Sequence, residues 1–264
     1  MILRDFNHGL DISTKKMLSV NLFPDSIFYC EILMDSSHWQ ILSHHSSENV
    51  DFEQLIYLPQ DIEQTLESDG YSRINIQVMS PAASMHKDAE AFKKQFPSLA
   101  HKIHYSQNLL SQENQCFFVL SRHQNNFLNN HFGAFEYRIK HFMFSLDTHY
   151  YDKKEDIAHC HLDGKKVHLY IKHSNSILYN SFDYHSNEDV LYFINAAYDA
   201  TKLNPKKLGL NISGWIDQDS ALWKMLNGYF IDIQVCNPIT LTMFGENKLP
   251  THHFFDHYLN VLCG

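Results

Sequence analysis

The fold is decided by residues 157–182, which read IAHCHLDGKKVHLYIKHSNSILYNSF. Within them Asp163-Gly164 is a strong signal for a two-residue hairpin turn, and His173-Ser-Asn-Ser176 marks a second turn. The stretch therefore predicts three short strands, over Ile157–Leu162, Lys166–His173 and Ile177–Phe182. A helix-length segment follows at 187–202, where the side chain of Ser186 or Asn187 can cap a helix that has Asp189 in its first turn.

The first half of the chain repeats this pattern. Three strands are predicted over Met17–Phe23, Ile27–Leu33 and His38–His44. Apolar and polar residues alternate in 18–22, and a period of two is typical of a half-buried strand. A helix-length segment follows at 52–67, but Pro59 interrupts it, so we expect a kink or two short helices there. A unit of three strands and a helix that occurs twice predicts a two-lobed α/β architecture.

Each half then continues with a strand, a helix and a strand. In the second half these elements are predicted at Leu208–Ile212, 218–227 and Phe230–Val235. In the first half the matching elements are Cys116–Leu120, Arg122–His131 and Phe135–Ile139. Their later position predicts an inserted subdomain within about 70–116, a part of the chain where we also expect a strand at Ile74–Val78 and a helix at Lys87–Phe96.

These patterns predict two lobes with mixed sheets, each built on one copy of a duplicated three-strand–helix–strand–helix–strand unit. Residues 17–152 form the first lobe, including the inserted subdomain. Residues 153–264 form the second lobe together with a C-terminal helix, which is predicted at His253–Leu262 from its amphipathic pattern.

The composition argues against several classes of partner. The formal net charge is −9 and the longest basic clusters are short pairs such as Lys15–Lys16, so the chain lacks the basic face that nucleic acid requires. The five cysteines are scattered and odd in number, which favours a reducing compartment. No apolar run approaches the ~18 residues of a membrane span, and the N-terminus lacks a signal-peptide core. We therefore expect a cytoplasmic protein.

The order of elements resembles the actin-like ATPase fold, which sugar kinases, the Hsp70 ATPase domain and actin share. The stretch 208–215, together with Phe230–Val235 and Asn237-Pro238, resembles the second lobe of the actin-like proteins of pilus assembly and type II secretion. The run Phe127–Tyr150 resembles the end of their first lobe. Over residues 17–240 the chain also looks like a member of an uncharacterised Bacteroidetes family with this fold, and the resemblance implies a bacterial source.

The chain departs from active members of that fold at the phosphate hairpins. Active members carry an Asp on the strand and a Gly in the turn, where backbone N–H groups face phosphate. Here the first hairpin, 21–26, has no Gly, and Pro24 lacks a backbone donor. The second hairpin keeps Asp163 and Gly164, which also suit an ordinary turn. Where the family has a Gly-Gly pair next to the adenine of the nucleotide, this chain has Ser213 and Gly214, so only one of the two glycines is present.

We therefore predict a non-catalytic pseudo-ATPase that acts as a protein-interaction or scaffolding module. It would have no catalytic residue and no cofactor, and it would bind a protein partner. The alternative is a nucleotide-binding ATPase or kinase-like protein, with ATP and Mg²⁺ held in the inter-lobe cleft by Asp163, Gly164, Ser213 and Gly214. The sequence does not predict the oligomeric state.

Two further patterns have structural explanations. His252, His253 and His257 give a spacing that can bind a metal, but we interpret them as surface histidines and assign no metal site. Asp217 and Asp219 are expected to cap or charge the start of the helix at 218–227.

Many aromatic residues lie in 127–151 and in 252–258, where core packing and a hydrophobic face for a partner are both possible.

Overall fold

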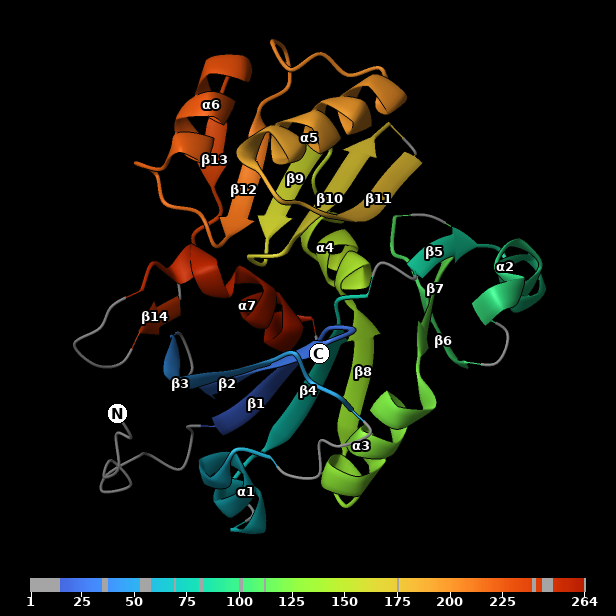
Figure 1. Cartoon of the computed structure of the whole chain (residues 1–264), viewed down its shortest axis with the longest axis vertical. Helices are drawn as coiled ribbons and strands as arrows, with labels where there is room; N and C mark the ends of the chain where they lie inside the picture. The colour runs from blue at the N-terminus through green and yellow to red at the C-terminus, as the bar shows by residue number, and fades with distance from the viewer. Residues whose placement is uncertain are drawn as a thin grey trace.

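The structure is a computed structural model, and it describes residues 15–34, 38–52, 58–68, 70–80, 83–99, 102–111, 113–174, 176–238, 241–243 and 249–263. Two lobes, each with its own sheet, lie one above the other, and a third, smaller sheet lies beside them (Figure 1). None of the described helices is long and apolar enough to cross a membrane.

The second lobe contains a five-stranded sheet in the order β11-β10-β9-β12-β13. Its strands are β9 (Ile157–Leu162), β10 (Lys166–His173), β11 (Ser176–Asp183), β12 (Leu210–Gly214) and β13 (Ile233–Val235). The first three are antiparallel, and β12 runs parallel to both β9 and β13. The predicted hairpin units of this half are confirmed.

Helices α5 (Asn187–Thr201) and α6 (Ala221–Tyr229) cover this sheet (Figure 1). Of the two predicted candidates, Ser186 and not Asn187 caps α5, and it forms a reciprocal capping box with Asp189. At the start of α6 the hydroxyl of Ser220 accepts the N–H of Trp223. The prediction that Asp217 and Asp219 cap this helix was therefore wrong, and their effect as charges near its start stays a prediction.

The first lobe contains a six-stranded sheet in the order β14-β3-β2-β1-β4-β8. Its strands are β1 (Lys15–Leu22), β2 (Ser26–Met34), β3 (Trp39–Glu48), β4 (Arg73–Val78), β8 (Tyr137–His141) and β14 (Leu241–Met243). Apart from β14, the order and directions repeat those of the second sheet. Helices α1 (Gln60–Glu67) and α3 (Arg122–Phe132) belong to this lobe, and α4 (Phe142–Tyr150) leads out of it to the second.

The helix predicted over 52–67 is shorter than expected. Pro59 directly precedes α1, where its fixed φ suits a helix start. Residues 53–57 of the prediction lie outside the described residues. Residues 35–37, part of the connection between the second and third predicted strands, and residues 81–82 lie outside them as well.

The strand that matches β12 is β4, and the prediction that Cys116–Leu120 plays this role was wrong. That stretch lies in β7 (Gln115–Leu120), which pairs with β5 (Ala83–His86) and β6 (Ile103–Asn108) in the third sheet. Between β5 and β6 the chain forms α2 (Ala89–Gln95) and the 3-10 turn η1 (Pro97–Leu99). An apolar run predicts a buried strand but does not say which sheet it joins.

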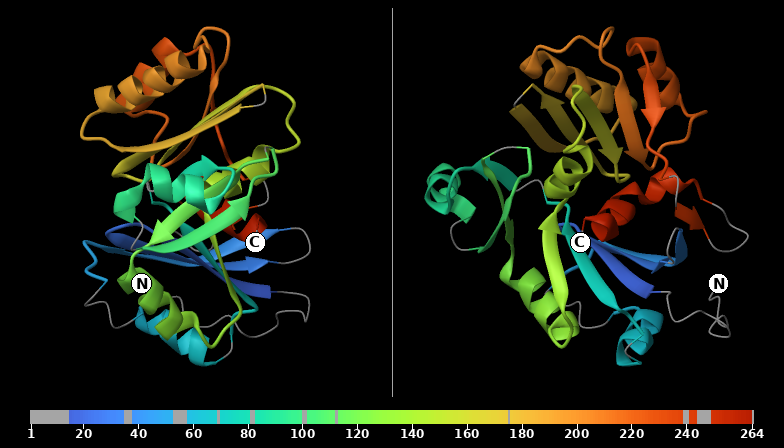
Figure 2. Two further views of the ribbon diagram at one scale, coloured as in Figure 1. Left: turned by 90° about the vertical axis from the view of Figure 1, so that its right-hand side faces the viewer. Right: turned by 180° about the vertical axis from the view of Figure 1, so that it is seen from behind.

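The C-terminal segment returns to the first lobe. Strand β14 pairs with β3, and the 3-10 turn η2 (Thr251–Phe254) leads into α7 (Phe255–Leu262). Helix α7 lies between the lobes (Figures 1 and 2), where it packs on β1, β4, α4 and β12. The predicted division into lobes at residues 152 and 153 stays a proposal, because the C-terminal segment, which follows the second lobe in sequence, also contacts the first.

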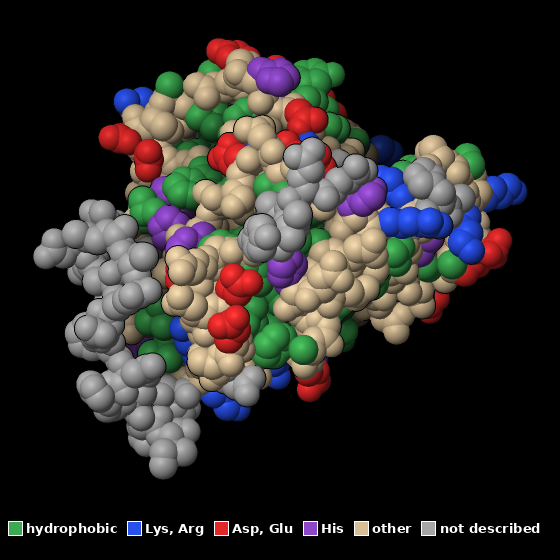
Figure 3. Space-filling model, turned by 60° about the horizontal axis from the view of Figure 1, so that its bottom comes forward, with side chains coloured by type: hydrophobic (Ala, Val, Ile, Leu, Met, Phe, Trp, Pro, Cys, Tyr) green, Lys and Arg blue, Asp and Glu red, His purple; other side chains and the backbone are tan. Residues whose placement is uncertain are grey.

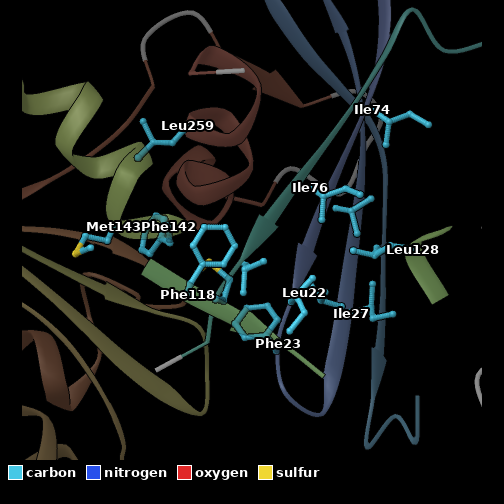
Figure 4. Packing of buried hydrophobic residues seen from close by; sticks show 14 of the residues in the cluster. Leu22, Phe23, Ile27, Ile74, Ile76, Phe118, Leu128, Phe142, Met143 and Leu259 are labelled. Atoms are coloured by element: carbon cyan, nitrogen blue, oxygen red, sulfur yellow. The ribbon is translucent and has the colours of Figure 1, made fainter. Parts of the chain in front are cut away.

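The main hydrophobic core extends from the first sheet to the inter-lobe helices. Leu22 and Ile76 of the sheet belong to the same cluster as Phe142 of α4 and Leu259 of α7 (Figure 4). Phe127, Phe132 and Phe142 are at most 3% exposed. Core packing therefore accounts for these members of the aromatic stretch at 127–151.

Candidate functional site

The turn of each lobe's first hairpin lies at the junction between the lobes. Lys165, after the turn of the second hairpin, places its Nζ 3.9 Å from a carboxylate oxygen of Asp25 and 3.5 Å from one of Glu48. All three side chains are about half exposed, so these ion pairs add little stability. They nevertheless show that the two turns face each other across the junction.

The carboxylate of Asp163 is occupied by its own hairpin. Its Oδ1 accepts the backbone N–H groups of Lys165 at 2.8 Å and Lys166 at 2.6 Å, and its Oδ2 lies 3.0 Å from His168 Nε2. Burial opposes ionisation, but His168 and the N–H groups outweigh it and hold the pKa of Asp163 below its ordinary value. Gly164 takes a φ of +94° in this turn. The two residues therefore build a hairpin.

Ser213 and Gly214 lie at the same end of the second sheet, beside the strand that leads to Asp163. In the parallel pairing of β12 with β9, Gly214 is opposite Leu162. The Ser213 hydroxyl lies 2.9 Å from both His159 Nε2 and His161 Nδ1. The four residues of the nucleotide alternative therefore lie at one end of the sheet. The Ser213 hydroxyl and the Asp163 carboxylate already have hydrogen-bond partners within the protein.

A carboxyl group of the C-terminal helix lies where the first strands of the two sheets end. Asp256 Oδ2 accepts a hydrogen bond from Asn21 Nδ2 of β1 at 2.7 Å and lies 3.7 Å from His161 Nε2 of β9. The Gln77 amide donates to the backbone oxygen of Asp256 at 3.2 Å. Asp256 is 7% exposed, and burial raises the pKa of its carboxyl to about 7.

Further buried polar contacts fix the same helix to the first sheet. His257 Nδ1 lies 2.8 Å from the Ser19 hydroxyl. The Asn260 amide donates to Ser19 Oγ at 2.9 Å and to the backbone oxygen of Asn75 at 2.8 Å. Burial lowers the pKa of His257 to about 3, so the ring is neutral.

The prediction of surface histidines on this helix was wrong, because His252, His253 and His257 are 5–8% exposed. His252 Nε2 lies 2.8 Å from the backbone oxygen of Ile216. Among the described residues, no group of three or more His, Cys, Asp or Glu side chains is arranged to hold a metal ion. The C-terminal helix packs against elements of both lobes. An amphipathic sequence pattern predicts that only one face of a helix is buried, which is why these histidines were expected at the surface.

A small cavity lies between the lobes beside Asp256. Besides Asp163, Asp256 and four histidines, it is lined by five aromatic side chains, Phe23, Phe28, Tyr29, Trp215 and Phe254. Its volume of about 30 Å³ leaves room for roughly two water molecules. Of the four residues of the nucleotide alternative, only Asp163 lines this cavity.

Sequence reasoning missed Tyr29, Trp215 and Asp256 as residues of a site. Tyr29 lies in a predicted strand and Trp215 just after one, where aromatic residues are common. A usable signal was present only for Asp256, because it is an acidic residue between Phe255 and His257 in a segment otherwise rich in aromatic and apolar residues.

The family model described as a protein of unknown function, DUF3822, matches residues 7–233. The chain belongs to this family. A comparison with the curated proteins finds no match for this DUF3822 chain.

Solved structures confirm the predicted actin-like fold of this DUF3822 chain. A crystal structure from Bacteroides thetaiotaomicron, of a protein with an actin-like ATPase fold and unknown function, matches with a TM-score of 0.70 at 17% identity. The match covers 97% of this chain and 100% of that one. A chain of the PilM–PilN type IV pilus biogenesis complex matches with a TM-score of 0.54 at 12% identity, over 94% and 98% of the two chains. At these identities the likeness concerns the fold.

Proposed function

We propose that this DUF3822 chain is a non-catalytic, actin-like protein that works by binding another protein in the bacterial cytoplasm. The observation that carries the proposal is the position of Asp256. Its carboxyl group lies between Asn21 and His161, at the ends of the first strands of the two lobes. The resemblance implies that active proteins of this fold hold phosphate and metal beside these strands. In the present chain, helix α7 lies at that position.

The charges at the junction support the same proposal. A phosphate group between the hairpins would face the carboxyl groups of Asp163 and Asp256, which both line the cavity. No Lys or Arg is among the described residues that line it, and Lys165 is paired with Asp25 and Glu48. The carboxylate of Asp163, whose pKa lies below its ordinary value, would repel a phosphate group, and the repulsion is stronger where water is excluded.

Two observations favour a cytoplasmic protein-binding role. The matched chain of the PilM–PilN structure is part of a protein complex, so a chain of this fold can serve as a binding partner. All five cysteines of the present chain are free thiols, as in proteins of a reducing compartment. We also propose that the common strand order of the two sheets reflects an internal duplication.

Thermal unfolding with and without millimolar Mg-ATP tests the proposal, together with an assay of ATP turnover. A ligand present at a hundredfold excess over its dissociation constant stabilises the folded state by about 2.7 kcal/mol. We expect no rise of the midpoint and no turnover. A rise of several degrees that disappears in Asp163→Ala would support the nucleotide alternative instead.

The partner half of the proposal has its own test. The chain is tagged at its genomic locus in the source bacterium, and proteins recovered with it are quantified by mass spectrometry. We expect one protein in near-equal amount with the bait, which a tagged unrelated cytoplasmic protein does not recover. Recovery of the bait alone would contradict a scaffolding role.

A further inference from the structure

The inter-lobe cavity has walls that suit a cation. Five aromatic rings line it, and those of Phe23 and Phe28 meet edge to face with their centroids 5.1 Å apart. The face of an aromatic ring carries negative electrostatic potential and attracts positively charged groups.

Two buried oxygen atoms of the cavity residues lack a hydrogen-bond partner. Within the described part of the chain, neither Tyr29 Oη nor Asp256 Oδ1 has one, although the two residues are only 1% and 7% exposed. A buried polar atom without a partner costs about 1–3 kcal/mol. A bound group that donates hydrogen bonds to these oxygens would recover that free energy.

The described residues of the cavity offer no unpaired positive charge. His45, one of its four histidines, places its Nε2 2.7 Å from a carboxylate oxygen of Asp61. The described residues that line the cavity include no Lys or Arg. Burial lowers the pKa of His44, His253 and His257, so these rings are neutral at pH 7. Figure 3 shows a group of Lys and Arg side chains over the outlying part of the molecule at the right, and several histidines near the junction of the lobes.

We propose that this cavity binds a primary ammonium group, carried by a lysine side chain of a protein or by a free amine. The lysine form of the proposal rests on the protein-binding function proposed above. The volume of about 30 Å³ accommodates an ammonium group and the methylene next to it, since each water takes roughly half of that space. Two lining residues, Trp215 at 42% exposure and His44, are exposed, and they place the entrance between the two lobes.

Proton release from Asp256 makes the binding depend on pH. The groups that face this carboxyl are His161 and Asp163 of the second lobe, Cys30 and Asn21 of the first, and His257 of its own helix. An ammonium ion favours the ionised carboxylate, whose pKa without ligand is about 7. Affinity should therefore rise as the pH increases from about 6 to about 8.

The test is a titration of the full-length protein with n-butylamine, followed by thermal unfolding and by ligand-observed NMR. n-Butanol serves as the neutral analogue, and potassium chloride matches the ionic strength. We expect binding of butylammonium, no comparable effect of butanol, and an affinity that rises with pH. Equal effects of butanol and butylamine, or no binding at tens of millimolar, would overturn the proposal.

Matched variants connect the binding to the cavity. Asp256→Asn removes the charge at nearly constant volume and should weaken butylammonium at least about tenfold, as expected for a lost charge-assisted hydrogen bond. Tyr29→Phe keeps the ring and removes the hydroxyl, so a smaller loss is expected. Asp183→Asn is the control, because this exposed carboxylate pairs with Lys166 and is not among the residues that line the cavity. Unchanged affinity in Asp256→Asn would overturn the assignment.

A short peptide with one lysine, and the same peptide with an acetylated lysine, separate the two sources of the ammonium group. Binding of the unmodified peptide at least as tight as that of butylamine supports a protein lysine. Binding of butylamine alone assigns the site to a free amine and overturns the link to a protein partner. Because the Mg-ATP experiment decides the proposed function independently, either hypothesis can fail without the other.

Discussion

Gly214 occupies a position that no other residue can take without a change in the backbone. Its φ is +87°, and a Cβ atom there would lie 2.0 Å from the backbone oxygen of Leu162. Gly164 has a similar φ of +94°, but a Cβ would meet no described atom within 4 Å. The two glycines therefore separate the effect of the dihedral angle from the effect of close packing.

We expect Gly214→Ala to destabilise the protein by more than about 3 kcal/mol, because it adds a backbone clash to the strain of a positive φ. Gly164→Ala should cost only the strain, about 1–3 kcal/mol. Thermal unfolding of both variants measures the difference. Equal midpoints would show that β9 and β12 can move apart at no cost, contrary to the tight packing seen here.

Asp163 and Asp256 line the same cavity, yet their pKa values move in opposite directions. Asp163 accepts two backbone N–H groups and faces His168, which favours the ionised form. Asp256 has Asn21 as a side-chain donor to Oδ2, and its desolvation dominates. Two carboxyls with separated pKa values can divide roles. Here one holds a turn and the other remains available to a ligand.

At the scale of the element, α7 is the part of the molecule that both lobes share. Leu259 is fully buried in the main core, whereas Leu262, one turn further on, is 45% exposed. Leu259→Ala should destabilise the protein by about 2–5 kcal/mol through lost burial and a cavity. Leu262→Ala should change the stability by less than about 0.5 kcal/mol.

Thermal unfolding, read by circular dichroism for both variants, checks this contrast. The substitution is the same and the helix is the same, so a difference in helix propensity cannot explain the result. Similar small losses for both variants would mean that α7 is docked only loosely between the lobes. In that event the C-terminal helix would not explain the closed junction, and the support for a non-catalytic role would weaken.

The same helix shows what a sequence can predict here and what it cannot. The hairpin units were predictable because turns such as Asp163-Gly164 and apolar alternation act over a few residues. The existence of α7 was predictable too, from its amphipathic pattern. Its place was not, because the contact of Asp256 with Asn21 joins positions 235 residues apart. For the same reason the apolar run at 116–120 was assigned to the wrong sheet.

At the scale of the whole molecule, the junction between the lobes is rich in buried, neutral histidines. Burial lowers the pKa of His141 to about 4 and those of His159 and His257 to about 3. Their rings bond to other groups of the interior, as His159 does to Ser213 and to the Tyr150 hydroxyl. A proton added to any of them would place a charge inside the protein.

The whole molecule should therefore lose stability in mild acid. Below about pH 6.5 the unfolded chain takes up protons on these histidines and the folded protein does not. Each such residue then lowers the free energy of unfolding by about 1.4 kcal/mol per pH unit. Asp256 has the opposite sign, since its raised pKa adds stability as the pH falls from about 7, but it is one group against at least three.

The measurement is the midpoint of thermal unfolding at a series of pH values from about 7.5 down to about 5. We expect a steep fall below about pH 6.5, which becomes shallower in His159→Gln because one proton-excluding ring is gone. His185→Gln is the control, because His185 is exposed, and it should leave the slope unchanged. A midpoint that stays level in acid would mean that the lobes separate enough for water to reach these rings, and that the junction is open in solution.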